Sequence, residues 1–260
     1  MELMQAVVLA LIQGFTEFLP ISSSGHLILV PALLAWPDQG LGFDIAVHVG
    51  TLLAVCAYFR RDLLAMATSL TRSETAEFRL AWRIIAATIP LGLAGLAFAD
   101  FVESELRSPV VIAASTAGFG VLLWCVDWLR RGNRSEQSLS WAQALAIGCG
   151  QALALIPGTS RSGITMTVAL ALGLSREAAG RFSFLLAIPA ISMAAVWELR
   201  QLAIDTAPIP WPALAVATAV SAATAFVTIK LFLNLIGRVG MSVFAIYRLI
   251  LAGWIVYAVY

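Results

Sequence analysis

Long apolar stretches alternate with short polar segments along most of the chain, and they set its architecture. A helix that crosses a bilayer needs roughly 20 predominantly apolar residues. Six stretches are predicted as complete spans, at about 43–59, 84–99, 110–128, 182–198, 213–233 and 242–260. The pattern therefore predicts an all-α, polytopic membrane protein with about six transmembrane helices.

Two further apolar segments, 1–35 and 141–174, do not fit this description. Each is about 35 residues long and has a polar, glycine-containing break near its middle. That length suits a helical hairpin that enters and leaves by one face of the membrane, rather than a single straight span. Such a re-entrant hairpin survives at membrane depth only where protein or a water-filled cavity surrounds it. We therefore expect two re-entrant helical hairpins in addition to the spans.

Basic residues gather in alternate loops, and this pattern predicts the orientation of the chain. Cytoplasmic loops carry an excess of Lys and Arg. The loops assigned to the cytoplasm hold Arg60, Arg61, Arg72, Arg79, Arg83, Arg130, Arg131, Arg134, Arg176, Arg181, Lys230 and Arg238. The opposite loops hold Asp100, Glu103, Glu105, Glu198 and Asp205, with a lone Arg107. The two faces alternate consistently through all six spans when both hairpins are re-entrant.

The polar breaks of the two hairpins resemble each other at a spacing of 138 residues. The matching pairs are Gln13 and Gln151, Ser22 and Ser160, Ser24 and Ser162, and Gly25 and Gly163. Three spans follow each hairpin, and because three is odd the second unit is inverted relative to the first. We therefore predict one membrane domain, 1–260, built from a first repeat, 1–128, and a second, inverted repeat, 141–260. The two hairpin tips then meet near the midplane, as expected for a polar site inside a bilayer.

Composition agrees with the membrane prediction and excludes one class of partner. Of 260 residues, 60% are hydrophobic and only 12% are charged, whereas soluble domains carry about 25% charged residues. The net charge of +1 gives no electrostatic case for nucleic acid, so membrane lipids are the expected surroundings. The three cysteines, Cys56, Cys125 and Cys149, have no metal or redox spacing and are predicted to be small core residues.

The polar residues at the two breaks are the candidates for chemistry. Glu17 and Gln13 are four residues apart and so share one helix face, and a carboxylate within a membrane segment costs roughly 2.5 kcal/mol or more. Serines at a helix start leave backbone N–H groups that bind anions. The first break adds His26, and the second adds Arg161, which can hold a phosphate with two hydrogen bonds. These residues predict a phosphate site with acid–base groups.

The residues alone leave two functions open, a phosphatase and an anion or lipid transporter. Inverted repeats with broken helices and charges near the midplane are typical of transporters. Asp44 and His48, one turn apart in the first span, are interpreted as a satisfied polar pair that lines the helix bundle.

Four segments of the chain resemble those of the undecaprenyl-diphosphate phosphatases, the bacitracin-resistance family of integral membrane phosphatases. They are residues 13–26, QGFTEFLPISSSGH; 157–165, PGTSRSGIT; 182–189, FSFLLAIP; and 244–248, FAIYR. The first two are long, occur in the family's order and are highly specific. The resemblance runs nearly from end to end.

The resemblance implies an enzyme and its site. The substrate is undecaprenyl diphosphate, and the product is the monophosphate carrier lipid, which is recycled for peptidoglycan synthesis. Glu17, Ser23, His26 and Arg161 are the expected catalytic residues, with Ser23 as nucleophile and His26 as its base. Direct attack by water, with Ser23 only binding the phosphate, is the alternative. The expected substrate-binding residues are Ser22, Ser24, Gly25, Gly158, Thr159, Ser160, Ser162 and Thr165.

The resemblance also implies a metal and a location. Mg²⁺ or Ca²⁺ is expected at Glu17 and Gln13, although some members have a second glutamate where this chain has Gln13, and an amide gives a metal only a neutral oxygen. The expected location is the bacterial cytoplasmic (inner) membrane, with the active site facing the periplasm. The oligomeric state stays open, with a homodimer as one candidate.

Overall fold

The computed structural model describes residues 2–37, 39–69, 75–202 and 211–259. Within these ranges the protein has eleven α-helices, two short 3₁₀ helices and one isolated β-bridge, between Arg134 and Leu174. The predicted all-α class is confirmed. Arg72 and Asp205, and the outer limits of the segments predicted at residues 1 and 260, lie outside the described residues.

Five helices of the described chain are long and apolar enough to cross a membrane. They are α3 (Leu41–Tyr58), α5 (Ala76–Glu105), α6 (Pro109–Leu129), α9 (Arg176–Leu202) and α10 (Trp211–Val239). A sixth predicted span falls on α11 (Ser242–Val259), a shorter apolar helix. The chain is therefore a multi-pass membrane protein.

The helices extend beyond the predicted spans at their basic ends. The α5 helix begins eight residues before position 84, α9 begins six residues before position 182, and α10 continues six residues past position 233. Hydropathy detects only the apolar part of a helix, while long basic side chains let the same helix continue toward water. The apolar pattern did not predict α4 (Arg60–Ser69) or the 3₁₀ helix η1 (Glu136–Ser138), because both are polar.

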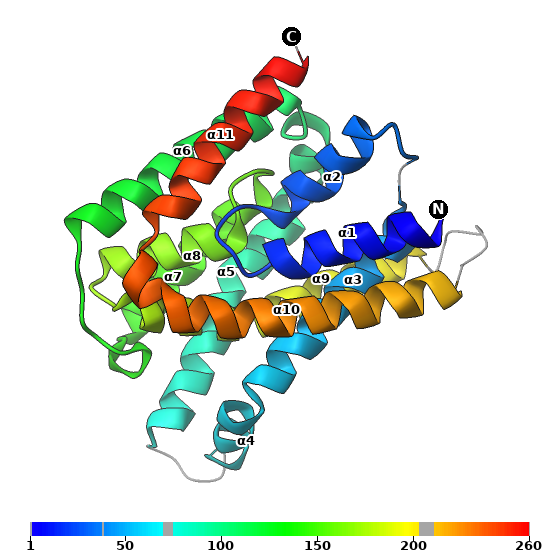
Figure 1. The fold of residues 1–260 in the computed structure, drawn as a ribbon. Helices are drawn as coiled ribbons and strands as arrows, with labels where there is room; N and C mark the ends of the chain where they lie inside the picture. Colours follow the sequence, from blue (N-terminus) through cyan, green and yellow to red (C-terminus); the bar gives the residue numbers. More distant parts are fainter. Residues whose placement is uncertain (1, 38, 70–74, 203–210, 260) are drawn as a thin grey trace.

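The two apolar segments that were predicted as hairpins do form pairs of short helices. The first pair is α1 (Leu3–Thr16) and α2 (Ser23–Leu33). The second is α7 (Trp141–Ala152), followed by the 3₁₀ helix η2 (Leu153–Leu155), and α8 (Arg161–Ala171). Figure 1 shows the pairs extending to opposite sides of the molecule, with their tips together at its centre. The Ser162 hydroxyl joins the tips by donating to the carbonyl oxygen of Leu19 at 2.8 Å.

The two tips have the same local construction. Ser22 precedes α2 with φ 71°, and Ser160 precedes α8 with φ 67°. A positive φ is strained for a residue with a side chain, costs of order 1–3 kcal/mol and clusters at functional sites. In each tip this serine makes a hydroxyl–hydroxyl hydrogen bond to the serine two residues later, at 3.3 Å in the first and 3.2 Å in the second.

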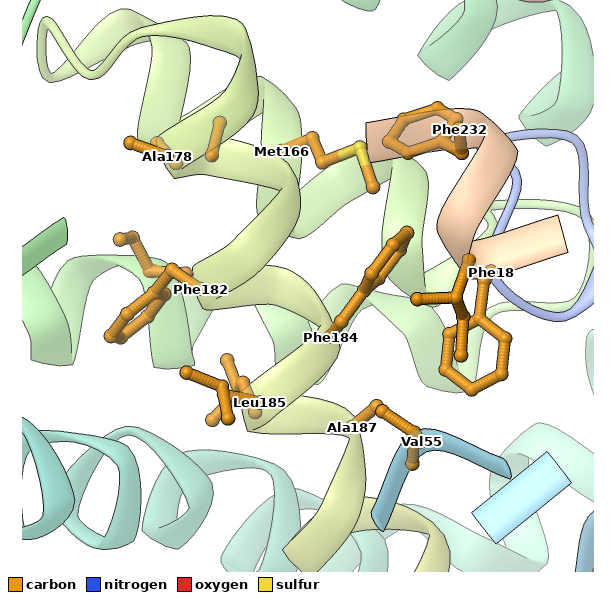
Figure 2. Close-up of a cluster of buried hydrophobic side chains, with 14 of the residues drawn as sticks. Phe18, Val55, Met166, Ala178, Phe182, Phe184, Leu185, Ala187 and Phe232 are labelled. Carbon is orange, nitrogen blue, oxygen red and sulfur yellow. The ribbon is translucent and has the colours of Figure 1, made fainter. Parts of the chain in front are cut away.

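Aromatic packing fixes the first tip against the centre of α9. Phe18 is fully buried and meets Phe184 edge to face, with ring centroids 5.1 Å apart. Phe184 in turn contacts Phe232 of α10 at 5.4 Å. Figure 2 shows Phe184 lying between these two rings. Since Phe18 follows Glu17 directly in the chain, this packing also fixes the position of the carboxylate.

Close approach to α10 brings α1 and α3 together. A Cβ at Gly14 of α1 would lie 2.6 Å from the carbonyl oxygen of Ser221, and one at Gly50 of α3 would lie 2.5 Å from that of Thr218. The Ser221 hydroxyl also donates to the carbonyl oxygen of Val47 at 2.6 Å. Small residues allow helix backbones to pack this closely in membranes, so Glu17 and His48 become neighbours.

Candidate active site

Glu17 is the centre of a buried polar cluster where the two tips meet. Its Oε2 accepts hydrogen bonds from the Ser23 hydroxyl at 2.6 Å and from Gln13 Nε2 at 3.0 Å. Its Oε1 accepts from Arg161 Nη2 at 2.7 Å. The carboxylate follows α1, the serine begins α2 and the arginine begins α8, so the cluster forms only when both hairpins are in place.

The ion pair between Glu17 and Arg161 satisfies two charges that are costly to bury. The Glu17 side chain is 8% exposed and the Arg161 side chain 13%. Intramembrane ionisable residues pair with one another and mark functional sites. Removing one partner would leave an uncompensated buried charge, at a cost of about 3–5 kcal/mol.

Arg161 has hydrogen-bonding capacity beyond this ion pair. Its Nη1 donates a long hydrogen bond of 3.4 Å to the carbonyl oxygen of Ser183, and its guanidinium lies 5.9 Å from the centre of the Phe18 ring. A guanidinium carries five N–H donors in a planar fork that fits a phosphate. The first turns of α2 and α8 add backbone N–H groups that have no partner within the helix. The arrangement can therefore bind an anion.

Ser23 is paired differently from the sequence-based expectation. We expected His26 to act as its base, but the Ser23 hydroxyl donates to Glu17. His26 instead bonds through Nδ1 to the carbonyl oxygen of Ser22 at 2.8 Å and through Nε2 to the Tyr247 hydroxyl at 2.6 Å. The two side chains share the first turn of α2, yet the tip directs them to different partners.

Several predicted substrate-binding residues use their side chains within the protein. The Ser160 hydroxyl caps α8 by accepting from the backbone N–H of Gly163 at 3.2 Å. Thr165 is fully buried and hydrogen-bonds to the Ser183 hydroxyl at 2.7 Å. The Ser162 hydroxyl donates to the carbonyl oxygen of Leu19 in the first tip. Their roles in substrate binding stay predictions.

The other predicted residues of the tips divide into buried and accessible positions. Gly158 has φ +89° and packs against Ser115 and Thr116 of α6. Thr159, Ser22 and Gly25 are buried, whereas Ser24 is exposed. Ser24 is thus the accessible hydroxyl of the first tip, next to the nucleophile candidate.

His48 belongs to the site, although the sequence suggested only a polar pair with Asp44. His48 Nδ1 donates to the carbonyl oxygen of Asp44 at 2.7 Å, which is the expected pairing made through the backbone. His48 Nε2 then lies 3.8 Å from Glu17 Oε2. Sequence could not show this contact, because it depends on how closely α1 and α3 pack on α10.

Arg248 is a second arginine that sequence analysis did not place. Its side chain is fully buried, and it donates to the carbonyl oxygens of Gly158 and Thr116 at 3.0 Å each. A longer contact of 3.5 Å reaches the carbonyl oxygen of Pro20. Arg248 therefore holds backbone of both tips rather than facing a ligand. Its place in the family-like segment 244–248 was the only signal in the sequence.

The residues around Glu17 fit an oxygen-coordinated cation that draws further ligands from a substrate. The described ranges contain no group of three or more His, Cys, Asp or Glu side chains suited to a metal. Gln13 Oε1, however, is buried without a hydrogen-bond partner in the described structure, beside the Glu17 carboxylate. Mg²⁺ commonly binds through one or two protein oxygens together with substrate phosphates.

The fold and the site together define an integral membrane protein with a serine hydroxyl, a carboxylate and an anion-binding arginine between two helical hairpins. The family described as "Bacitracin resistance protein BacA" matches residues 6–254. The chain belongs to this family.

Curated relatives are similar over nearly the whole chain. The chain is 54% identical over 259 residues to "Undecaprenyl-diphosphatase 2" of Stutzerimonas stutzeri, with 96% of each protein covered. It is 49% identical over 262 residues to "Undecaprenyl-diphosphatase" of Nitrosococcus oceani, with 99% of each covered. The protein of the same name from Teredinibacter turnerae is 53% identical over 256 residues.

Proposed function

We propose that this protein hydrolyses undecaprenyl diphosphate to undecaprenyl phosphate and inorganic phosphate. The observation that carries the proposal is the 2.6 Å hydrogen bond from the Ser23 hydroxyl to a buried carboxylate, beside an arginine that can bind phosphate. Family membership and the curated relatives support the activity and its substrate. The product is the carrier lipid, and its recycling accounts for bacitracin resistance.

The first chemical step transfers the terminal phosphoryl group to Ser23. Glu17 Oε2 takes the hydroxyl proton while Ser23 Oγ attacks the terminal phosphorus. The bond between that phosphorus and the bridging oxygen breaks, and undecaprenyl phosphate leaves with the bridging oxygen. Arg161 and the N–H groups at the starts of α2 and α8 offset the charge on the transferring group.

Substrate binding also involves the partner of Glu17. In the free protein Arg161 pairs with the Glu17 carboxylate. A bound phosphate offers the same guanidinium a second anion, so the arginine that holds the carboxylate also holds the substrate beside it.

The second step releases phosphate and restores the serine. Water attacks the phosphoserine, and Ser23 Oγ leaves with the proton that Glu17 took in the first step. The freed Glu17 carboxylate takes the proton of the attacking water and passes it to the departing phosphate, which restores the starting state. Glu17 and the unpartnered Gln13 Oε1 are the residues that would hold Mg²⁺ or Ca²⁺. Such an ion would supply positive charge that offsets the charge of the phosphate oxygens.

The proposed topology has six spans and two re-entrant hairpins in two inverted repeats. The matching backbone of Ser22 and Ser160, and the opposite directions of the hairpins in Figure 1, support it. The basic loops place the second hairpin on the cytoplasmic side and the first on the periplasmic side. The site, at the tip of the first hairpin, then opens to the periplasm of the bacterial inner membrane.

Phosphate release from undecaprenyl diphosphate by the purified protein in detergent tests the function. Detergent removes the two compartments that transport needs, so release separates an enzyme from a transporter. We expect release that depends on Mg²⁺ or Ca²⁺, stops with EDTA and is lost in Glu17→Ala. Folded protein that binds the lipid but releases no phosphate with either metal would contradict the proposal and favour transport.

A further inference from the structure

A second polar pair lies beside the site and has no part in the steps above. His26 on α2 and Tyr247 on α11 are joined by the 2.6 Å hydrogen bond between Nε2 and the phenol. Their rings are stacked, with centroids 5.7 Å apart and planes 7° from parallel. Tyr247 is 40% exposed. Because part of the Tyr247 side chain is exposed, the pair is accessible to a ligand.

The hydrogen bonds of His26 define what the pair can offer. The carbonyl oxygen of Ser22 can only accept, so His26 Nδ1 carries a proton and donates it. Nε2 then either accepts from the Tyr247 hydroxyl or, when protonated, donates to it. In the second state the Tyr247 hydroxyl can donate its proton to another acceptor. The pair can therefore offer a hydrogen-bond donor to an anion that lies next to α2.

An apolar groove leads to this pair. The groove has a volume of about 560 Å³ and runs between α1, α10 and α11. Leu11, Phe15 and Phe244 are among its apolar walls, and the rings of His26 and Tyr247 also line it. A groove with apolar walls and a polar pair fits an amphiphile whose anionic group lies beside His26.

We propose that the His26–Tyr247 pair binds the prenyl-side phosphate of the diphosphate substrate and that this groove takes the first isoprenoid units. The inference rests on the proposed function and assigns a subsite within it. Ser23 and His26 are three residues apart on α2, less than one helical turn of about 5.4 Å. The terminal phosphate at Ser23 and the prenyl-side phosphate at His26 therefore lie side by side.

A second groove, between α5 and α9, is the alternative place for the tail. Its volume is about 400 Å³, and its lining includes Leu96, Met193 and Glu198. The Glu198 carboxylate would repel a phosphate, whereas the groove at α11 brings two hydrogen-bonding rings. Charge therefore favours the groove at α11.

Inhibition by the two halves of the substrate tests the subsite. Farnesyl monophosphate carries only the prenyl-side phosphate, whereas inorganic phosphate mimics the terminal one. In Tyr247→Phe we expect the inhibition constant of farnesyl monophosphate to rise roughly tenfold or more, with that of inorganic phosphate unchanged. Tyr58→Phe is the control, because Tyr58 packs between Phe59 and Phe226 and lines neither groove. Equal effects on both inhibitors, or no effect on either, would overturn the inference.

Substitutions that fill each groove test the place of the tail. Leu11→Trp narrows the groove at α11, and Leu96→Trp narrows the one between α5 and α9. We expect a weaker inhibition by farnesyl monophosphate in the first variant alone, and the reverse pattern would refute the assignment. Failure of the proposed function looks different, because wild-type protein would then bind farnesyl monophosphate, measured by calorimetry, but would not hydrolyse the diphosphate.

Discussion

At the scale of single residues, the candidate site is organised around Glu17. Its carboxylate accepts from Ser23, Gln13 and Arg161, and His48 stands 3.8 Å away. Arg161 is bound by Oε1 and Ser23 by Oε2, so one carboxylate joins the proposed nucleophile to the proposed phosphate-binding arginine. In the proposed mechanism a bound phosphate offers Arg161 a second anion.

Replacement of Arg161 by lysine tests whether the planar guanidinium is needed to bind phosphate. Lysine keeps the charge but loses the planar pair of donors that fits a phosphate. We expect kcat/KM to fall about 100-fold or more, as measured by phosphate release. Arg131→Lys, at an exposed position beyond α6, is the control and should be unchanged. Near-normal activity of Arg161→Lys would refute the assignment.

Glutamine substitutions separate the two candidate bases. Glu17→Gln removes the proton acceptor of Ser23, so kcat should fall about 100-fold or more. His26→Gln leaves the Ser23–Glu17 hydrogen bond in place, so its main effect should be a higher KM. Steady-state kinetics of both variants gives the answer. A kcat that collapses only in His26→Gln would restore histidine as the base.

Sequence predicted the residues of the site better than their contacts. The resemblance gave Glu17, Ser23 and Arg161, which the structure brings together. It could not give the partner of His26, because Tyr247 lies 221 residues away and meets it only through folding. The cysteine prediction was wrong for two of three, since Cys125 and Cys149 are exposed. In a membrane protein the residues of an apolar stretch can face either the lipid or the protein core, so an apolar neighbourhood does not show that a cysteine is buried.

At the scale of helices, the backbone contacts of α1 and α3 with α10 decide whether the site forms. Gly14 and Gly50 make those contacts possible. The atom nearest to a Cβ added at either glycine is a backbone carbonyl oxygen, which cannot rotate away as a side chain can. The apolar pattern predicted where the helices lie but not which pairs pack closely. A glycine in an apolar stretch has no sequence signal that distinguishes a tight contact from open space.

Two glycine-to-alanine variants test this close packing. Gly50→Ala places a Cβ 2.5 Å from the carbonyl oxygen of Thr218, so α3 must move away from α10. We expect a destabilisation of about 1–3 kcal/mol, seen as a lower melting temperature in detergent. Gly95→Ala is the matched control, because no heavy atom lies within 4 Å of its added Cβ. Equal stability of the two variants would contradict the described packing.

At the scale of the whole molecule, the two helix pairs extend to opposite sides (Figure 1) and their tips meet at the candidate site. The charges between spans and the spacing of 138 residues predicted this arrangement, and the hydrogen bond from Ser162 to Leu19 confirms that the tips meet. A second copy of the chain stays a candidate partner. The proposed orientation in the membrane rests on the positions of the basic loops and can be tested directly.

Cysteine labelling tests the orientation. In a background without Cys56, Cys125 and Cys149, we expect Ser24→Cys to react with a membrane-impermeant reagent from the periplasm. Arg131→Cys, in a basic loop, should react only from the cytoplasm. Labelling of both variants from the same side would contradict the proposal that the site and the basic loop lie on opposite sides of the membrane.

The proposed mechanism requires that Ser23 accepts the terminal phosphoryl group, and a single-turnover experiment can detect this transfer. Purified protein is mixed with undecaprenyl diphosphate labelled in its terminal phosphate, quenched in acid and analysed by peptide mass spectrometry. We expect label on Ser23 that rises and then decays as free phosphate appears, and no label in Ser23→Ala. Full turnover without label on Ser23 at any time, or normal turnover in Ser23→Ala, would contradict it.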